Sequence, residues 1–180
     1  MGELSVEMVY IFLMVTLIGA VLHLFLSKTR TKNRISEVFL LWFLVVMVGF
    51  GSIWAFMGHV FMADMVAAMI GWPAGSPFQF EVGIANLSYG ILGILCWKFR
   101  DNFWTAAVIA ISTFYLGDAY GHITSIMQTG NMAAGNAGFA LYIDIIIPIV
   151  LICLLIAYKV TAKKQIEAPG PEESSLPKSA

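Results

Sequence analysis

The sequence predicts an all-α integral membrane protein: a bundle of five membrane-spanning helices with one short helix on its outer surface. Hydrophobic residues make up 59% of the 180 residues and charged residues 12%, and the mean hydropathy is +0.85. A water-soluble domain of this size does not have such a composition. Five apolar stretches are long enough to cross a hydrocarbon core of about 30 Å, which takes roughly 20 helical residues.

The five spans are predicted at 5–26, 35–58, 77–97, 103–124 and 139–158. The first follows an acidic start without Lys or Arg, so it is a retained anchor rather than a secretory signal. The third begins at Ser76-Pro77, with Ser76 as N-cap and Pro77 at the first helical position. Glycines on the third and fourth spans predict close approach between helices; they are Gly83, Gly90, Gly93, Gly117 and Gly121.

The positive charges predict the orientation of the chain. All ten Lys and Arg residues lie in 28–34, in 98–100 or beyond the fifth span, and the loops at 59–76 and 125–138 contain none. Because basic loops stay in the cytoplasm, the N-terminus is expected outside and the C-terminus inside.

Two segments are too short or too polar to cross the membrane. Residues 61–70 are apolar but span less than the bilayer, so they predict an interfacial helix on the outer surface. Residues 165–180 are polar and contain several Pro and Gly residues, which predicts a disordered cytoplasmic tail after a membrane domain of residues 1–164.

Ionisable residues from four helices are predicted at one depth, in the outer half of the membrane. Asp118 and His122 are four residues apart, so they project from one helical face. A buried carboxylate costs about 2.5–3.5 kcal/mol even on lenient insertion scales, and no Lys or Arg lies at this depth. The counter-charge is therefore expected to be a proton, a histidinium or a bound cation. The predicted site consists of Glu81, Asp118, His122, Asp144 and His59, with Asn86, Tyr120 and Tyr142 as polar neighbours.

Three interpretations of this layer remain open from the sequence. The His and carboxylate residues form a ligand set suited to a divalent metal such as zinc, iron or manganese. In an enzyme, Asp118, His122 and Glu81 would hold that metal to activate water, and Asp144 would accept the proton. The same residues could instead form a structural hydrogen-bond network, or a relay for protons or ions.

Three functions correspond to these interpretations. The first is a small polytopic protein whose pocket binds a cation, either a metal or protons. The second is a non-catalytic accessory or scaffold subunit of a larger membrane complex. The third is a proton-coupled or ion-coupled transporter, for which a homo-oligomer could supply a path. The lipid bilayer is the expected partner, and no nucleic-acid-binding patch is present in the sequence.

Three segments resemble a family of small prokaryotic membrane proteins of unknown function. They are Gly71-Trp72-Pro73 through Leu87, Gly117-Asp118-Ala119-Tyr120-Gly121-His122 and Gly135-Asn136-Ala137-Gly138. The resemblance covers about residues 35–158. It implies a multi-span fold in a prokaryotic plasma membrane and no particular activity.

Overall fold

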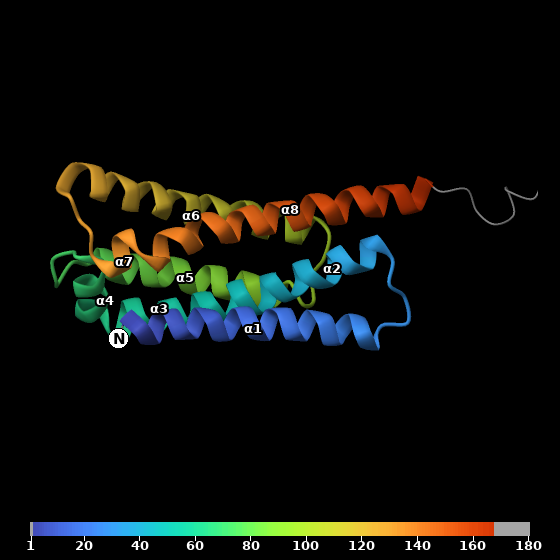
Figure 1. Cartoon of the computed structure of the whole chain (residues 1–180), viewed down its shortest axis with the longest axis horizontal. Helices are drawn as coiled ribbons and strands as arrows, with labels where there is room; N and C mark the ends of the chain where they lie inside the picture. Colours follow the sequence, from blue (N-terminus) through green and yellow to red (C-terminus); the bar gives the residue numbers. More distant parts are fainter. Residues whose placement is uncertain (1, 168–180) are drawn as a thin grey trace, which may run out of the picture.

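A computed structural model describes the backbone of residues 2–167 and the side chains of residues 6–164. Within these residues the secondary structure is entirely helical (Figure 1). The elements are α1 (Gly2–Leu26), α2 (Lys32–Trp42), the π-helix η1 (Phe43–Phe50), α3 (Gly51–Phe61), α4 (Ala63–Ile70), α5 (Phe78–Leu95), α6 (Asn102–Thr129), α7 (Ala134–Ala137) and α8 (Phe139–Glu167). Helices α2, η1 and α3 follow one another without a break.

Four helices are long and apolar enough to cross a membrane: α1, the continuous helix 32–61, α5, and the segment of α7 and α8. They coincide with four of the predicted spans. The remaining predicted span, 103–124, is α6, whose 28 residues correspond to about 42 Å of helix. It is not among the four because Asp118, His122 and several Ser, Thr and Tyr residues make it less apolar.

The two segments outside the spans also have counterparts in the structure. The predicted interfacial helix 61–70 is α4. Helix α8 continues to Glu167, so residues 165–167, which were expected in the tail, are helical. The rest of the predicted tail, 168–180, lies outside the described residues.

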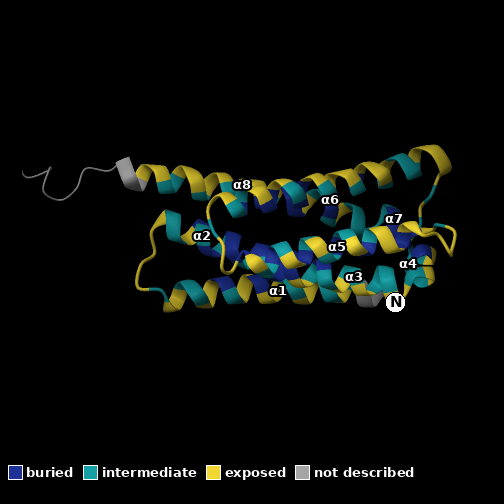
Figure 2. Cartoon of the chain, turned by 180° about the vertical axis from the view of Figure 1, so that it is seen from behind, coloured by how far each residue is buried: buried dark blue, intermediate teal, exposed yellow. Residues whose placement is uncertain are grey.

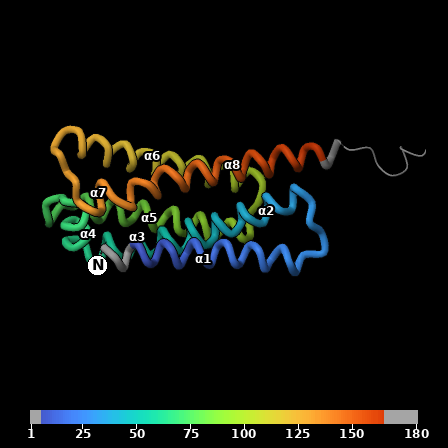
Figure 3. Tube along the Cα trace, in the orientation of Figure 1, coloured from blue at the N-terminus to red at the C-terminus, as the bar shows by residue number. Residues whose placement is uncertain are grey.

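The long helices run along one axis in an elongated bundle. Helix α6 packs along α8, α3 packs along α5, and α1 lies against α2 and η1. The Cα trace in Figure 3 shows the loop after α1 at one end of the bundle and α4 and α7 at the other.

Ion pairs and hydrogen bonds join the basic segments at one end of the bundle. Glu37 accepts from Arg34 at 2.8 Å and from Arg100 at 3.1 Å. Asn33 donates to the backbone carbonyl of Tyr158 at 3.1 Å. These contacts connect the first turns of α2, the segment before α6 and the later part of α8. The basic loops of the sequence therefore share one end of the molecule, opposite α4 and α7.

The buried core lies between α2, η1, α6 and α8, where Figure 2 shows the buried residues concentrated. Its largest side chains are fully buried, among them Trp104, Leu40, Leu44, Ile111 and Leu151. Many large apolar side chains on the outward faces of α1 and α8 are instead exposed. Apolar surface of this extent is typical of helices that face lipid.

Close packing of α5 against η1 and α3 depends on glycine. A Cβ on Gly93 would lie 2.6 Å from the Leu44 carbonyl oxygen and 2.7 Å from Gly49 Cα, and one on Gly90 would lie 3.0 Å from the Gly49 carbonyl oxygen. Since these are backbone atoms of the neighbouring helix, no side chain could move to make room. The predicted close approach of the third span is confirmed.

Candidate functional site

A large cavity lies at the end of the bundle that contains α4 and α7. Its volume is about 1360 Å³, and residues of α1, η1, α3, α4, α5, α6, α7 and α8 line it. The cavity separates the α6 and α8 pair from the α3 and α5 pair. Most of its wall is apolar or aromatic, including Trp54, Trp72, Phe78, Phe114 and Phe139.

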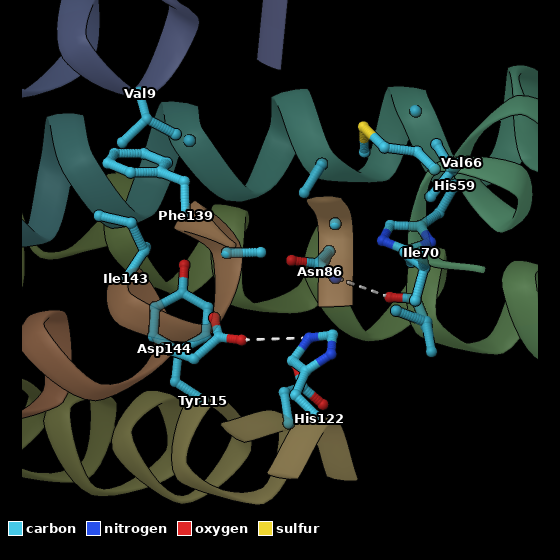
Figure 4. A pocket seen from close by; sticks show the side chains of 18 of the residues that line it. Val9, His59, Val66, Ile70, Asn86, Tyr115, His122, Phe139, Ile143 and Asp144 are labelled. Carbon is cyan, nitrogen blue, oxygen red and sulfur yellow. Dashed lines mark hydrogen bonds and ion pairs between the residues drawn. The ribbon is translucent and has the colours of Figure 1, made fainter. Parts of the chain in front are cut away.

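The α6 and α8 wall carries the acidic part of the cavity. Asp118 and His122 lie one turn apart on α6, and Asp144 faces them from α8. The Nε2 atom of His122 lies 3.5 Å from Oδ2 of Asp144, and both side chains are almost completely buried (Figure 4). Asp118 is close enough to Asp144 for their charges to interact. Tyr115 stands beside Asp144 in the same wall.

The fully buried side chain of Asn136 determines which nitrogen of His122 carries a proton. The amide nitrogen of Asn136 donates to the Asn131 carbonyl at 2.8 Å and to the His122 carbonyl at 3.4 Å. The amide oxygen therefore faces His122 Nδ1, at 2.9 Å. Because this oxygen can only accept, Nδ1 carries a hydrogen. In the neutral imidazole the lone pair is then on Nε2, directed at Asp144.

The loop after α6 positions Asn136. Asn131 donates to the Ile70 carbonyl at 2.9 Å and to Ser125 Oγ at 3.2 Å, and it accepts from the Ala133 N–H at 3.1 Å. At the end of α4, Gly71 has φ +80°, and a Cβ there would lie 2.6 Å from Asn131 Oδ1. The α4 end and the α6–α7 loop therefore form one packed cap over the cavity.

The α3 and α5 wall carries a second, separate polar group. His59 Nδ1 lies 2.6 Å from Gln79 Oε1, and the buried Nε2 of Gln79 has no hydrogen-bond partner. Asn86 is buried on α5 and donates to the Val82 carbonyl at 3.0 Å. At the start of α5, Ser76 Oγ accepts from the Phe78 N–H at 3.3 Å, but α5 begins at Phe78 with Pro77 in the N-cap position, one residue later than predicted.

Five of the predicted site residues line the cavity, and three do not. The five are Asp118, His122, Asp144, His59 and Asn86. Glu81 is exposed, as are Tyr120 (74%) and Tyr142 (59%). Helical rotation of about 100° per residue explains these positions. Tyr120 and Tyr142 are each two residues from an inward-facing side chain, and Glu81 is five residues from Asn86, so all three point away from the cavity.

The predicted metal ligands are distributed over different surfaces. His59 lies on the wall opposite Asp118 and Asp144, and Glu81 lies outside the cavity. Within the part of the chain that the structure describes, no three His, Cys, Asp or Glu residues are arranged to hold a metal ion.

The charge of the cavity is strongly one-sided. Its lining contains Glu7, Asp118 and Asp144 but no Lys or Arg. Among residues 6–164, Asp118 forms no hydrogen bond or ion pair, and Asp144 has only the contact with His122. Asp144 is buried and Asp118 partly buried, and carboxylates withdrawn from water without donors are costly unless a proton or cation compensates them.

The glycines of the fourth span have a different role from the predicted one. A Cβ on Gly117 or Gly121 would meet no atom within 4 Å, and both residues line the cavity. They do not bring another helix close. Their lack of side chains instead leaves the acidic wall of the cavity open beside Asp118 and His122.

Three residues near the site were not predicted as parts of it: Asn136, Gln79 and Tyr115. Asn136 lies in the predicted loop 125–138, between Gly135 and Gly138. That loop has no charged residue, so nothing in it indicated a site. Gln79 is the second residue of α5, in its first turn. Tyr115 is three residues before Asp118 and therefore on the same face of α6, a spacing that could have identified it.

The comparisons with known proteins identify the family alone. The family model DUF6790, described as a family of unknown function, matches residues 6–164. No curated protein and no solved structure matches the chain. The match covers the whole bundle, including the cavity and the α6–α7 loop. The chain therefore belongs to DUF6790, a family of unknown function.

Proposed function

We propose that the protein is a five-span protein of a prokaryotic plasma membrane whose cavity binds a cation at Asp118, His122 and Asp144. The cation that the geometry favours is a proton, exchanged between His122 and Asp144. The supporting observation is the orientation of His122, whose Nδ1 is committed to Asn136 while its Nε2 faces a carboxylate at 3.5 Å.

One proton is sufficient to neutralise this pair. It lies on Nε2, giving an imidazolium beside a carboxylate, or on Asp144, giving a carboxylic acid beside a neutral imidazole. Either form avoids an uncompensated charge on two side chains that are almost completely buried. The second carboxylate, Asp118, has no such partner and supplies the remaining negative charge.

Infrared spectroscopy of the full chain in detergent, recorded across a pH series, tests the proposal. A protonated carboxyl group has a C=O band that a carboxylate lacks. We expect a pH-dependent carboxyl band in the wild-type protein that disappears in Asp144→Asn and persists in Glu81→Gln, which removes an exposed acid from α5. The Asp144→Asn spectrum is subtracted from the wild-type spectrum at each pH. If no pH-dependent carboxyl band remains, the proposal is contradicted.

The topology supports access from outside the cell. All described Lys and Arg residues lie near the end of the bundle opposite α4 and the cavity, so the positive-inside bias directs the cavity outward. In this orientation the N-terminus is outside and α6 is the fourth of the five spans.

Cysteine labelling tests that orientation in intact cells. In a chain with Cys96 and Cys153 replaced by Ser, a membrane-impermeant maleimide should label Ala74→Cys, in the exposed loop before α5. It should not label Lys98→Cys, in the exposed loop after α5, until the cells are opened. The reverse pattern would show that the orientation is wrong.

A further inference from the structure

The size of the cavity is not explained by a proton. Pockets for drug-sized ligands have volumes of about 300–1,000 Å³, whereas this cavity has about 1360 Å³. Its walls are mainly apolar, and Trp54, Trp72, Phe114 and Phe139 contribute aromatic rings. A space with these dimensions and walls suits an organic molecule with bulky apolar groups.

The charge of the lining determines the sign of the charge that such a molecule should carry. The titratable groups that face the cavity are Glu7 and Tyr10 on α1, His59 on α3, Tyr115, Asp118 and His122 on α6, and Asp144 on α8. No fixed positive charge is among the described lining residues. An anion would meet carboxylates that no Lys or Arg of the described lining neutralises, whereas a cation would neutralise them.

We propose that the cavity binds a lipophilic organic cation, such as a quaternary ammonium or phosphonium compound. Its charge lies beside Asp118 and Asp144, and its apolar groups pack on the aromatic wall, where cation–π contacts add to the attraction. Gly117 and Gly121 leave the space beside the carboxylates free for bulky groups.

This inference rests on the proposed function, because the same carboxylates hold the proton. Binding of one cation to the protonated site releases one proton, so charge is conserved in the exchange. The affinity for the cation therefore rises with pH while the site loses its proton, and stops rising once the site is deprotonated.

Isothermal titration calorimetry of the full chain in dodecyl maltoside tests the inference with tetraphenylphosphonium. We expect saturable binding, tighter at higher pH, with proton release measured from the heats in buffers of different ionisation enthalpy. Tetraphenylborate has the same shape and the opposite charge, and it should not bind saturably. Equal binding of the two ions, or no saturable binding of the phosphonium, would overturn the inference.

Two variants test the location of the site. Asp118→Asn should weaken tetraphenylphosphonium binding at least about tenfold, whereas Glu81→Gln, an exposed acid on α5, should leave it unchanged. Gly121→Leu places a side chain in the open space of the cavity and should abolish binding. Ala106→Leu introduces the same side chain on an exposed face of α6 and should have no effect. Unchanged affinity in both Asp118→Asn and Gly121→Leu would overturn the assignment.

The infrared titration separates a failure of this inference from a failure of the proposed function. A pH-dependent Asp144 band without phosphonium binding would overturn the inference and leave the proton site intact. A missing Asp144 band would overturn the proposed function, and with it the exchange of a proton for the cation.

Discussion

Replacing Gly93 by Val is expected to destabilise the protein by about 3 kcal/mol, the upper part of the range for overpacked cores. The new Cβ would lie 2.6 Å from the Leu44 carbonyl oxygen and 2.7 Å from Gly49 Cα. Helices α5 and η1 would have to separate along the packed half of the bundle. The measurement is the free energy of unfolding in detergent, followed by circular dichroism.

Gly117→Val provides the matched control. The substitution is the same and the position is also inside a helix, but a Cβ on Gly117 meets no atom within 4 Å. We expect its stability to stay within about 1 kcal/mol of the wild type, because glycine itself is unfavourable in a helix by a similar amount. Equal losses in the two variants would mean that α5 does not approach η1 as described.

The second large effect is expected from Asn136→Leu. Asn136 is fully buried and connects the Asn131 carbonyl, the His122 carbonyl and His122 Nδ1. A leucine leaves these groups without their partner, at a cost of about 1–3 kcal/mol for each group that water does not reach. The unfolding temperature should fall markedly. Asn102→Leu, an exposed amide at the start of α6, is the control and should change it little.

The arrangement of the helices could be predicted because it depends on strong, local signals. Continuous apolar stretches located α1, α5 and α8, and the Ser76-Pro77 pair marked the start of α5. The basic loops indicated which ends share a side, and contacts such as Arg100 with Glu37 at 3.1 Å agree with that grouping. The segment 61–70 was predicted as an interfacial helix because it is apolar but too short to cross the membrane, and it contains α4.

The site could be predicted only in part, because depth along a helix does not give rotation about its axis. Asp118 and His122 were expected on one face, and both line the cavity. The same 100° rule would have excluded Tyr120, two residues from each, once that face was taken as inward. For Glu81 the sequence offers no such reference. Glu81 and Asn86 lie on different faces of α5, and either face could have been the one directed inward.

Other features depend on tertiary contacts that no local pattern encodes. The sequence did not distinguish glycines that allow packing, such as Gly93, from glycines that leave space, such as Gly121. The difference depends on which helix lies opposite each one. Similarly, Asn136 reaches His122 only because the loop after α6 folds back under α4, where Asn131 contacts the Ile70 carbonyl at 2.9 Å.

The orientation of His122 can be tested most directly by nitrogen NMR of protein that is labelled with ¹⁵N-histidine and reconstituted in lipid. The His122 signals are assigned as those lost in His122→Gln. Nδ1 is expected to stay protonated across the pH range in which the Asp144 carboxyl band changes. The neutral imidazole is expected to have its lone pair on Nε2, and Asn136→Leu should relax this preference. A His122 whose Nε2 carries the proton while Nδ1 is bare would contradict the central claim that Asn136 orients the imidazole toward Asp144.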